Sequence, residues 1–192
     1  MSFLIANHVD QVVAVDAAEG MIDVLKRKLL QEGAPVNVKP LCLLLEDPED
    51  SGLPPADQSD PNGERQKFDL ITSHLVLHHI PDLEPVLSTM FGCLAAGGRT
   101  MLTDFQDFGP EAKRFHAASK MAGVARHGIN VEEMTELMHK VGFVNVECRP
   151  EWTMTKTIEK FDGEFGNAGK PGEGQGEKLD FPFLICYGEK PS

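Results

Sequence analysis

The chain has 192 residues, of which 41% are hydrophobic, and a formal net charge of −12. This length predicts one domain, residues 1–192, with a core of its own. The excess of acidic residues argues against nucleic acid or an anionic membrane as a partner, since both are bound by basic patches. No apolar run approaches the ~20 residues of a membrane span. The start MSFLIANHVDQ lacks a basic leader and a cleavage site, so we expect a cytoplasmic protein.

The four cysteines are too far apart in the sequence to form a recognisable binding motif. No C-x-x-C pair occurs, which argues against a zinc ribbon. We therefore expect free thiols in a reducing compartment rather than a disulfide framework. The residues are Cys42, Cys93, Cys148 and Cys186.

Strand and helix patterns alternate in the first part of the chain. The run QVVAVD, Gln11–Asp16, is rich in β-branched residues and predicts a buried parallel strand. Apolar residues at helical spacing predict a helix over 18–31, which Gly33 ends. A second strand is expected over 36–45, although Pro40 interrupts it, and residues 46–66 have the composition of a loop.

The same alternation continues as far as residue 105. FDLITS, Phe68–Ser73, predicts a third strand, residues 83–94 a helix that ends before Gly97-Gly98, and residues 99–105 a fourth strand. Such βαβ units predict an α/β fold with a mostly parallel sheet that is covered by helices.

The pattern changes after residue 105. We expect a helix over 110–126 and a second over 131–141, capped by Asn130 and ended by Gly142. Three extended runs follow the helices, and the last two are separated by a glycine-rich segment, 161–178, that we expect to be flexible. The runs are Phe143–Cys148, Trp152–Thr157 and Phe181–Tyr187. They predict an antiparallel C-terminal strand at the edge of the sheet.

Ligands of open α/β sheets bind beyond the carboxyl ends of the strands, so the residues that follow each strand are site candidates. Asp16 ends the first strand and can accept hydrogen bonds from two ribose hydroxyls. Aspartate is equally favoured as a helix N-cap, and geometry alone leaves both roles open. The other candidates at these positions are Glu46, Asp47, Ser73, His74, Thr103, Asp104 and Phe105.

Two stretches, VVAVDAAEGMIDVLKRKL and FDLITSHLVLHHIPDLEPVLSTMFGCLAAGGRTMLTDF, resemble the class I S-adenosylmethionine-dependent methyltransferases of the small-molecule type. VEEMTELMHKVGFVNVEC resembles the helix and strand before the antiparallel hairpin of that family, and the resemblance extends from Gln11 to Lys190. It implies a Rossmann-like, doubly wound fold with S-adenosylmethionine as the cofactor and a small molecule as the methyl acceptor.

The resemblance also implies roles for individual residues. Asp16 would hold the ribose hydroxyls of the cofactor, and Ala17 and Met21 would line its adenosine side. Leu45 would pack on the adenine ring, while Glu46 or Asp47 would face the adenine amino group. Ser73 and His74 would lie near the methionine part, and Gly97-Gly98 would form the turn into the next strand.

The chain departs from this family in one respect. Such enzymes open with a strand and a G-x-G-x-G loop, whose glycines let the backbone approach the cofactor. Here Met1–Val9 resembles the helix that follows that loop, which suggests a truncated sequence or a fragment. A central strand buries side chains worth roughly 6–12 kcal/mol, similar to the net stability of a domain. We therefore expect this chain to bind S-adenosylmethionine weakly or not at all by itself.

Three histidines crowd the stretch FDLITSHLVLHHIPD. His74 and His78 are four residues apart, but the H-E-x-x-H arrangement is absent, a strand precedes them and Pro81 follows, so we expect no metal site. His74 is instead a candidate general base, with a structural role as the alternative. His78 and His79 are expected to shape the loop before Pro81.

These features favour methyl transfer to a small molecule. The alternatives are a non-catalytic methyltransferase-like protein and, less favoured, a nicotinamide-dependent oxidoreductase, in which Asp16 would also suit a ribose. Residues 106–130 are expected to form the substrate wall, and they add His116 and His127 as further base candidates. Their apolar residues fit an apolar or amphipathic acceptor, although helix packing explains them equally well: Phe108, Phe115, Met121 and Val124.

Overall fold

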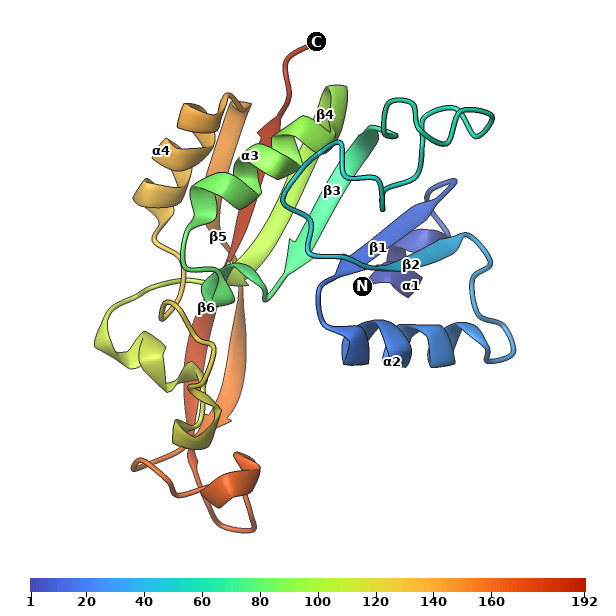
Figure 1. The fold of residues 1–192 in the computed structure, drawn as a ribbon. Coiled ribbons are helices and arrows are strands. Elements are labelled where there is room, and N and C mark those ends of the chain that lie inside the picture. Colours follow the sequence, from blue (N-terminus) through green and yellow to red (C-terminus); the bar gives the residue numbers. More distant parts are fainter. The chain divides into compact units, whose positions relative to one another are not determined.

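A computed structural model describes residues 1–192 and divides them into two compact units, Met1–Lys67 and Phe68–Ser192 (Figure 1). Each unit has strands, helices and a hydrophobic cluster of its own. The length predicts one domain, and whether the two units fold together as that domain stays a prediction. None of the helices combines the length and apolar character that crossing a membrane requires.

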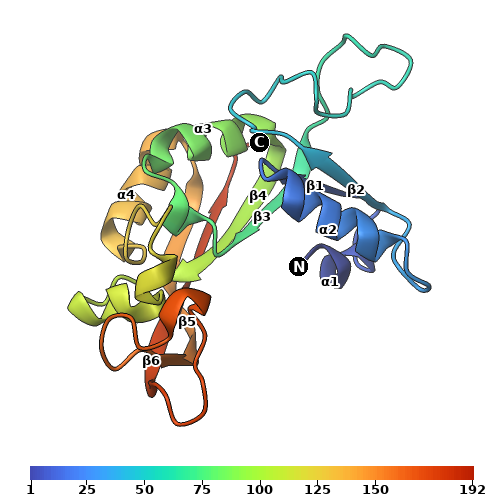
Figure 2. The same cartoon turned by 60° about the horizontal axis from the view of Figure 1, so that its bottom comes forward.

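The first unit is built on a pair of parallel strands. Its elements are α1 (Ser2–Ala6), β1 (Val12–Asp16), α2 (Glu19–Leu29) and β2 (Val38–Cys42). Figure 2 shows α2 alongside β1 and β2. Both helices contribute to one apolar cluster with the two strands, made of Ala6, Val12 and Val38 with Ile5, Ala14, Leu25 and Leu29 packed against them.

Both strands of this unit match the sequence prediction, and Pro40 lies inside β2. Proline has no N–H to donate, so a central strand excludes it. Here β2 has one strand neighbour, β1, which leaves the other edge of β2 free of ladder bonds. Pro40 is tolerated because β2 is an edge strand.

The predicted loop over 46–66 is also confirmed. It contains turns and one isolated bridge, between Pro55 and Arg65. The Arg65 side chain is buried, and its guanidinium donates to the carbonyl oxygens of Leu53 at 3.3 Å and Pro61 at 2.8 Å. A single arginine thereby satisfies carbonyl groups that a loop cannot pair in a ladder.

The second unit contains a four-stranded sheet with the order β3-β4-β6-β5. The strands are β3 (Phe68–His74), β4 (Leu94–Phe105), β5 (Val144–Ile158) and β6 (Glu177–Glu189). β3 and β4 are parallel, whereas β6 is antiparallel to both β4 and β5. The C-terminal strand is therefore antiparallel as predicted, but it lies inside the sheet and β5 forms the edge. The apolar run of β6 fits this position, because Phe181, Phe183 and Leu184 are fully buried.

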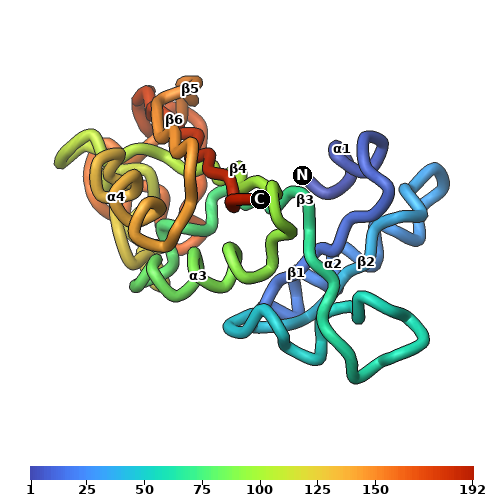
Figure 3. Tube along the Cα trace, turned by 90° about the horizontal axis from the view of Figure 1, so that it is seen from above, coloured from blue at the N-terminus to red at the C-terminus, as the bar shows by residue number.

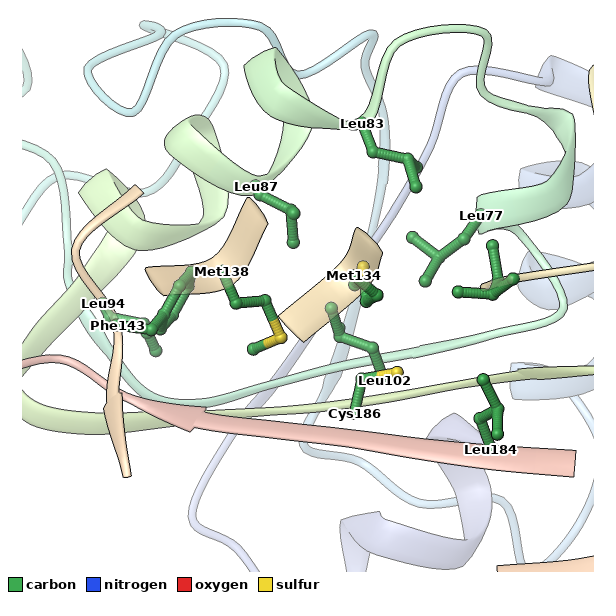
Figure 4. Packing of buried hydrophobic residues seen from close by; sticks show 11 residues of the cluster. Leu77, Leu83, Leu87, Leu94, Leu102, Met134, Met138, Phe143, Leu184 and Cys186 are labelled. Carbon is green, nitrogen blue, oxygen red and sulfur yellow. The ribbon is translucent and has the colours of Figure 1, made fainter. Parts of the chain in front are cut away.

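Two helices, α3 (Leu83–Cys93) and α4 (Val131–Val141), cover one face of this sheet. Figure 4 shows Leu87 from α3 and Met134 and Met138 from α4 above Leu102 and Cys186 of the strands. The caps of α4 are those the sequence predicts. Asn130 Oδ1 accepts from the Glu133 N–H at 2.9 Å, and Gly142 ends the helix with φ +115°.

Residues 110–126 do not form the predicted helix. They contain two short 3-10 turns, Pro110–Phe115 and Ala118–Lys120, with extended backbone at His116 and Ala117 between them. Phe115 is buried, and its ring stacks on Phe105 with centroids 4.2 Å apart. Tertiary packing of this ring overrides the local helical pattern.

Two more boundaries differ from the prediction. The strand β4 begins at Leu94 rather than Arg99, so Gly97, with φ +73°, lies within it. The two runs expected over 143–157 form one strand, β5, whose register shifts between Pro150 and Trp152. β5 and β6 are paired along most of their length, and Figure 3 shows them as neighbours when the molecule is seen from above.

The glycine-rich segment between β5 and β6 is held by two carboxylates. Glu159 accepts from the N–H groups of Ala118 at 2.8 Å and Phe165 at 2.9 Å. Glu164 accepts from the N–H groups of Lys160 at 2.7 Å and Gly176 at 3.1 Å. These hydrogen bonds give the segment a defined conformation, whereas its expected flexibility stays a prediction.

Candidate functional site

Asp16 lies at the carboxyl end of β1, and ligands of open α/β sheets bind beyond the carboxyl ends of the strands. Its Oδ1 accepts from the Ala18 N–H at 2.8 Å. The N-cap of α2 is Ala18, so Asp16 does not cap the helix in the usual way but orders the turn before it. The half-buried carboxylate keeps its second oxygen, Oδ2, for another donor.

A cavity of about 410 Å³ opens beside Asp16 within the first unit. Met21, predicted to contact a cofactor, lines it together with Asp16. The other lining residues include apolar side chains that the sequence did not single out, namely Phe3, Ile22 and Leu25. An apolar hollow next to a carboxylate suits a ligand with a flat ring at one end and hydroxyl groups at the other.

The remaining predicted residues of this unit lie outside the cavity lining. Ala17 is exposed on the turn after β1. Leu45, Glu46 and Asp47 follow the end of β2 by several residues. Asp47 is engaged locally, because its Oδ1 accepts from the Glu49 N–H at 2.8 Å. The structure thus brings Asp16 and Met21 together, and the roles of the other four stay predictions.

In the second unit, β3 extends one residue beyond the predicted end, so Ser73 and His74 are its last two residues. The Thr103 hydroxyl donates to the Ser73 carbonyl oxygen at 3.2 Å, and His74 Nδ1 lies 2.8 Å from the same hydroxyl oxygen. Since the hydroxyl has a single hydrogen, Thr103 accepts from His74 Nδ1–H. This arrangement favours the Nδ1–H tautomer, which leaves Nε2 of the exposed imidazole without a hydrogen.

The residue after His74 has an uncommon backbone conformation. Leu75 has φ +56°, in the left-handed region that non-glycine residues rarely adopt. Its N–H donates to the Thr103 carbonyl oxygen at 2.9 Å, which holds the turn in place. Strain of this kind often marks a functional position, and here it lies in the turn directly after His74.

The other two histidines of the predicted stretch meet a partner from the distant segment 106–130. His78, His79 and His116 place one ring nitrogen each within 4.8 Å of one another, and His74 is not among them. Burial lowers the pKa of His116 to about 4, and the neighbouring His78 and Lys156 add to this effect. His116 is therefore neutral at physiological pH. His127 is exposed and lies outside the group.

A second cavity, of about 470 Å³, lies in the second unit and is lined by His116. Most of its other lining side chains are charged: Lys113, Arg114, Glu159, Lys160 and Asp162. The apolar residues expected to face an acceptor pack elsewhere, since Phe115 is buried and Phe108 packs against its cluster. Of the expected apolar set, Met121 lines the cavity.

Glycines with the spacing G-x-G-x-G do occur in the chain, at Gly172, Gly174 and Gly176. They connect the antiparallel strands β5 and β6, so they do not follow a parallel strand as a cofactor loop does. Before Asp16 the sequence contains no glycine, the first being Gly20.

Parallel pairs β1–β2 and β3–β4, with site candidates at their carboxyl ends, define a Rossmann-like α/β protein. The sequence profile of a methyltransferase domain matches residues 3–148. The chain belongs to this methyltransferase-domain family.

Individual proteins show the same relationship at lower similarity. The sequence is 31% identical to phosphoethanolamine N-methyltransferase 2 of Caenorhabditis elegans over 85 residues, and these residues make up 44% of the present chain. The matched part spans only 19% of the length of that relative.

Solved structures share the fold. One from Bacillus halodurans has a TM-score of 0.68 at 18% identity and covers 100% of this chain and 87% of its own. Haemonchus contortus phosphoethanolamine N-methyltransferase 2, in complex with phosphomonomethylethanolamine and S-adenosylhomocysteine, has a TM-score of 0.61 at 15% identity. That match covers 98% of this chain and 46% of the nematode enzyme. At these identities the likeness establishes the fold.

Proposed function

We propose that this chain carries out, or forms part of a protein that carries out, S-adenosylmethionine-dependent methyl transfer to a small molecule. Membership of the methyltransferase-domain family supports the reaction class. The observation that carries the proposal is the Asp16 carboxylate, which ends β1 beside an apolar cavity with one oxygen still available.

The residues around Asp16 suit the adenosine part of the cofactor. A carboxylate accepts hydrogen bonds from neighbouring hydroxyls, and such charge-assisted bonds contribute about 1.5–3 kcal/mol each. Ile22, Leu25 and Met21 line the adjoining cavity and offer an apolar surface to a ring. Asp16 would thus bind the ribose and these side chains the adenine. The contributions of Ala17, Leu45, Glu46 and Asp47 belong to the same proposal.

S-adenosylmethionine supplies a methyl group that is already activated on a sulfonium, so the protein mainly has to align the acceptor and remove its proton. His74 is suited to the second task. Its Nδ1–H is held by Thr103, which keeps the lone pair on Nε2 and fixes the ring. As the acceptor atom formed its bond to the methyl carbon, the bond from this carbon to the sulfonium sulfur would break and leave S-adenosylhomocysteine, and the proton of the acceptor would pass to His74 Nε2. Ser73 lies beside it at the end of β3.

Residues 106–130 are proposed to form part of the acceptor wall. Their contribution to the charged cavity, through Lys113, Arg114 and His116, favours a polar acceptor over the apolar one that the sequence suggested. The phosphorylated acceptor bound by the nematode enzyme has this character, but that ligand is known only for the relative.

Titration of the purified chain with S-adenosylmethionine, S-adenosylhomocysteine and NAD in parallel tests the cofactor. Binding of the first two, weakened by Asp16→Ala, supports the proposal. Stronger binding of NAD would favour the oxidoreductase alternative. Binding of none at millimolar concentration would favour a non-catalytic methyltransferase-like protein.

A further inference from the structure

We propose that His78, His79 and His116 form a binding site for one divalent transition-metal ion of the zinc class. Their ligand nitrogens lie within 4.8 Å of one another. Their rings are also close, with centroids 4.0 Å apart for His78 and His79 and 5.0 Å apart for His78 and His116.

Two buried ring nitrogens in this group have no hydrogen-bond partner, namely His78 Nε2 and His116 Nδ1. A buried polar atom without a partner costs about 1–3 kcal/mol, so two in the same place call for an explanation. Neutral imidazole nitrogens with an exposed lone pair are the preferred nitrogen ligands of zinc. A metal ion at this point would satisfy both atoms at once.

The opposite side of two of these rings is already fixed. His78 Nδ1 lies 2.9 Å from Asp104 Oδ1, and the side chains are 2% and 1% exposed. His79 Nδ1 donates to the Gly123 carbonyl oxygen at 2.7 Å. Metal-binding histidines usually donate their other N–H to a carboxylate or a backbone carbonyl, which sets the tautomer and orients the ring. Both partner types occur here, and each leaves Nε2 of its histidine as the ligand atom.

To bind one metal ion, the three ligand nitrogens would have to move only slightly closer together. With Zn–N bonds of about 2.0–2.1 Å, ligand nitrogens of a tetrahedral site lie about 3.3 Å apart. The three nitrogens, now within 4.8 Å of one another, would have to approach by at most about 1.5 Å. Three protein ligands leave one position for water, as in sites with an accessible metal.

Charges of both signs surround the histidines, including the five charged side chains of the cavity that His116 lines. Asp104 offers a negative carboxylate behind His78. Lys156 is the opposing cation, and its ammonium lies 3.8 Å from the centroid of the Phe115 ring. Asp104 therefore offsets the repulsion that Lys156 exerts on a bound cation.

The site would fasten the segment after His116 to the turn after β3. Without metal, this segment is already attached by hydrogen bonds from the Ala125 and Arg126 N–H groups to the His78 carbonyl oxygen, at 3.0 and 3.1 Å. The competing explanation is that the histidines act only through these contacts. The two explanations differ in whether the folded chain takes up metal.

The test is a titration of the chelator-treated 192-residue chain, under a phosphine reductant, with Co²⁺ alone and then Zn²⁺. We expect one Co²⁺ per chain, visible absorption bands of tetrahedral cobalt, their loss on adding Zn²⁺, and a rise in melting temperature with either ion. Absence of uptake would overturn the proposal, as would a thiolate-to-cobalt charge-transfer band, which would indicate cysteine ligands.

Variants separate this site from adventitious binding. His79→Gln changes an exposed residue and should weaken binding more than about ten-fold while the circular dichroism spectrum is unchanged. Asp104→Asn should weaken it by about 10–100-fold through the orientation of His78. His139→Gln, on the exposed side of α4, is the matched control and should bind as the parent chain does. Equal weakening by His79→Gln and His139→Gln would show binding to surface histidines only.

Discussion

Asp104 receives two hydrogen bonds from His78, one from the ring Nδ1 at 2.9 Å and one from the backbone N–H at 3.1 Å. The two residues come from adjacent parts of the fold, the end of β4 and the turn after β3. Because both side chains are almost completely buried, neither can exchange its partner for water. This pair fixes the turn that follows the candidate base His74.

The first prediction concerns this pair. Asp104→Ala leaves the buried His78 ring and backbone N–H groups without their acceptor, and each unpaired group costs about 1–3 kcal/mol. Urea denaturation should therefore show a loss of unfolding free energy in this range or somewhat above it. Asp69→Ala, which changes an exposed aspartate of β3, is the control and should alter stability by less than about 0.5 kcal/mol. Equal stability of the two variants would contradict the burial argument.

The second prediction concerns the tautomer of His74. Nitrogen NMR of the imidazole should find the neutral ring protonated on Nδ1, because Thr103 accepts that proton. Thr103→Val removes the acceptor and should shift the ring toward the Nε2–H form. Thr72→Val, on the same strand as His74, should leave the tautomer unchanged. A parent chain already in the Nε2–H form would remove the basis for His74 as a base acting through Nε2.

The third prediction concerns pH. The pKa of His116 falls from 6.5 to about 4 on folding, so the unfolded chain takes up the proton first as the pH decreases. The stabilisation from a neutral His116 is complete above 6.5 and is lost as the pH falls toward 4, with a limit of about 3 kcal/mol.

Urea denaturation in the presence of a chelator measures this loss. His116→Gln should have a shallower decline of unfolding free energy over the same pH range. His127→Gln, which removes an exposed histidine, should follow the parent chain. Parallel curves for all three proteins would show that His116 is not the group responsible.

The fourth prediction concerns the ends of α4. Asn130→Ala removes the acceptor of the Glu133 N–H and should lower the unfolding free energy by about 1 kcal/mol. Gly142→Ala places a side chain at φ +115°, with Phe91 carbon 3.3 Å from the new Cβ, and should destabilise the chain at least as much. Thermal unfolding measures both. Gly20→Ala is a suitable comparison, because nothing lies within 4 Å of the added Cβ.

The sequence predicted the elements whose signals are local. The helix over 131–141 carries its own cap residues at Asn130 and Gly142, and the structure confirms both ends. Asp16 and His74 became site candidates because of their positions at strand ends, and the structure places each as the last residue of its strand. Pro110–Phe115 was assigned wrongly because its conformation depends on the stacking of Phe115 on Phe105, which no local pattern contains.

The histidine group shows the same limit. Spacing drew attention to His74 and His78, four residues apart, but β3 ends at His74 and directs the two side chains to different partners. The histidine that joins His78 and His79 is His116, far along the chain. The three histidines meet because segment 106–130 packs against the turn after β3. The spacing of residues along the sequence does not reveal such a tertiary contact.

The central claim is that the end of β1 binds S-adenosylmethionine through Asp16, and NMR detection of backbone amides tests it most directly. Addition of S-adenosylmethionine to the 192-residue chain should shift the amides of Ala18 and Met21, which lie beside Asp16. Affinity should be weaker than micromolar, since no glycine loop precedes Asp16, and Asp16→Ala should weaken it further. Shifts confined to other residues, or an affinity that Asp16→Ala does not change, would contradict the account.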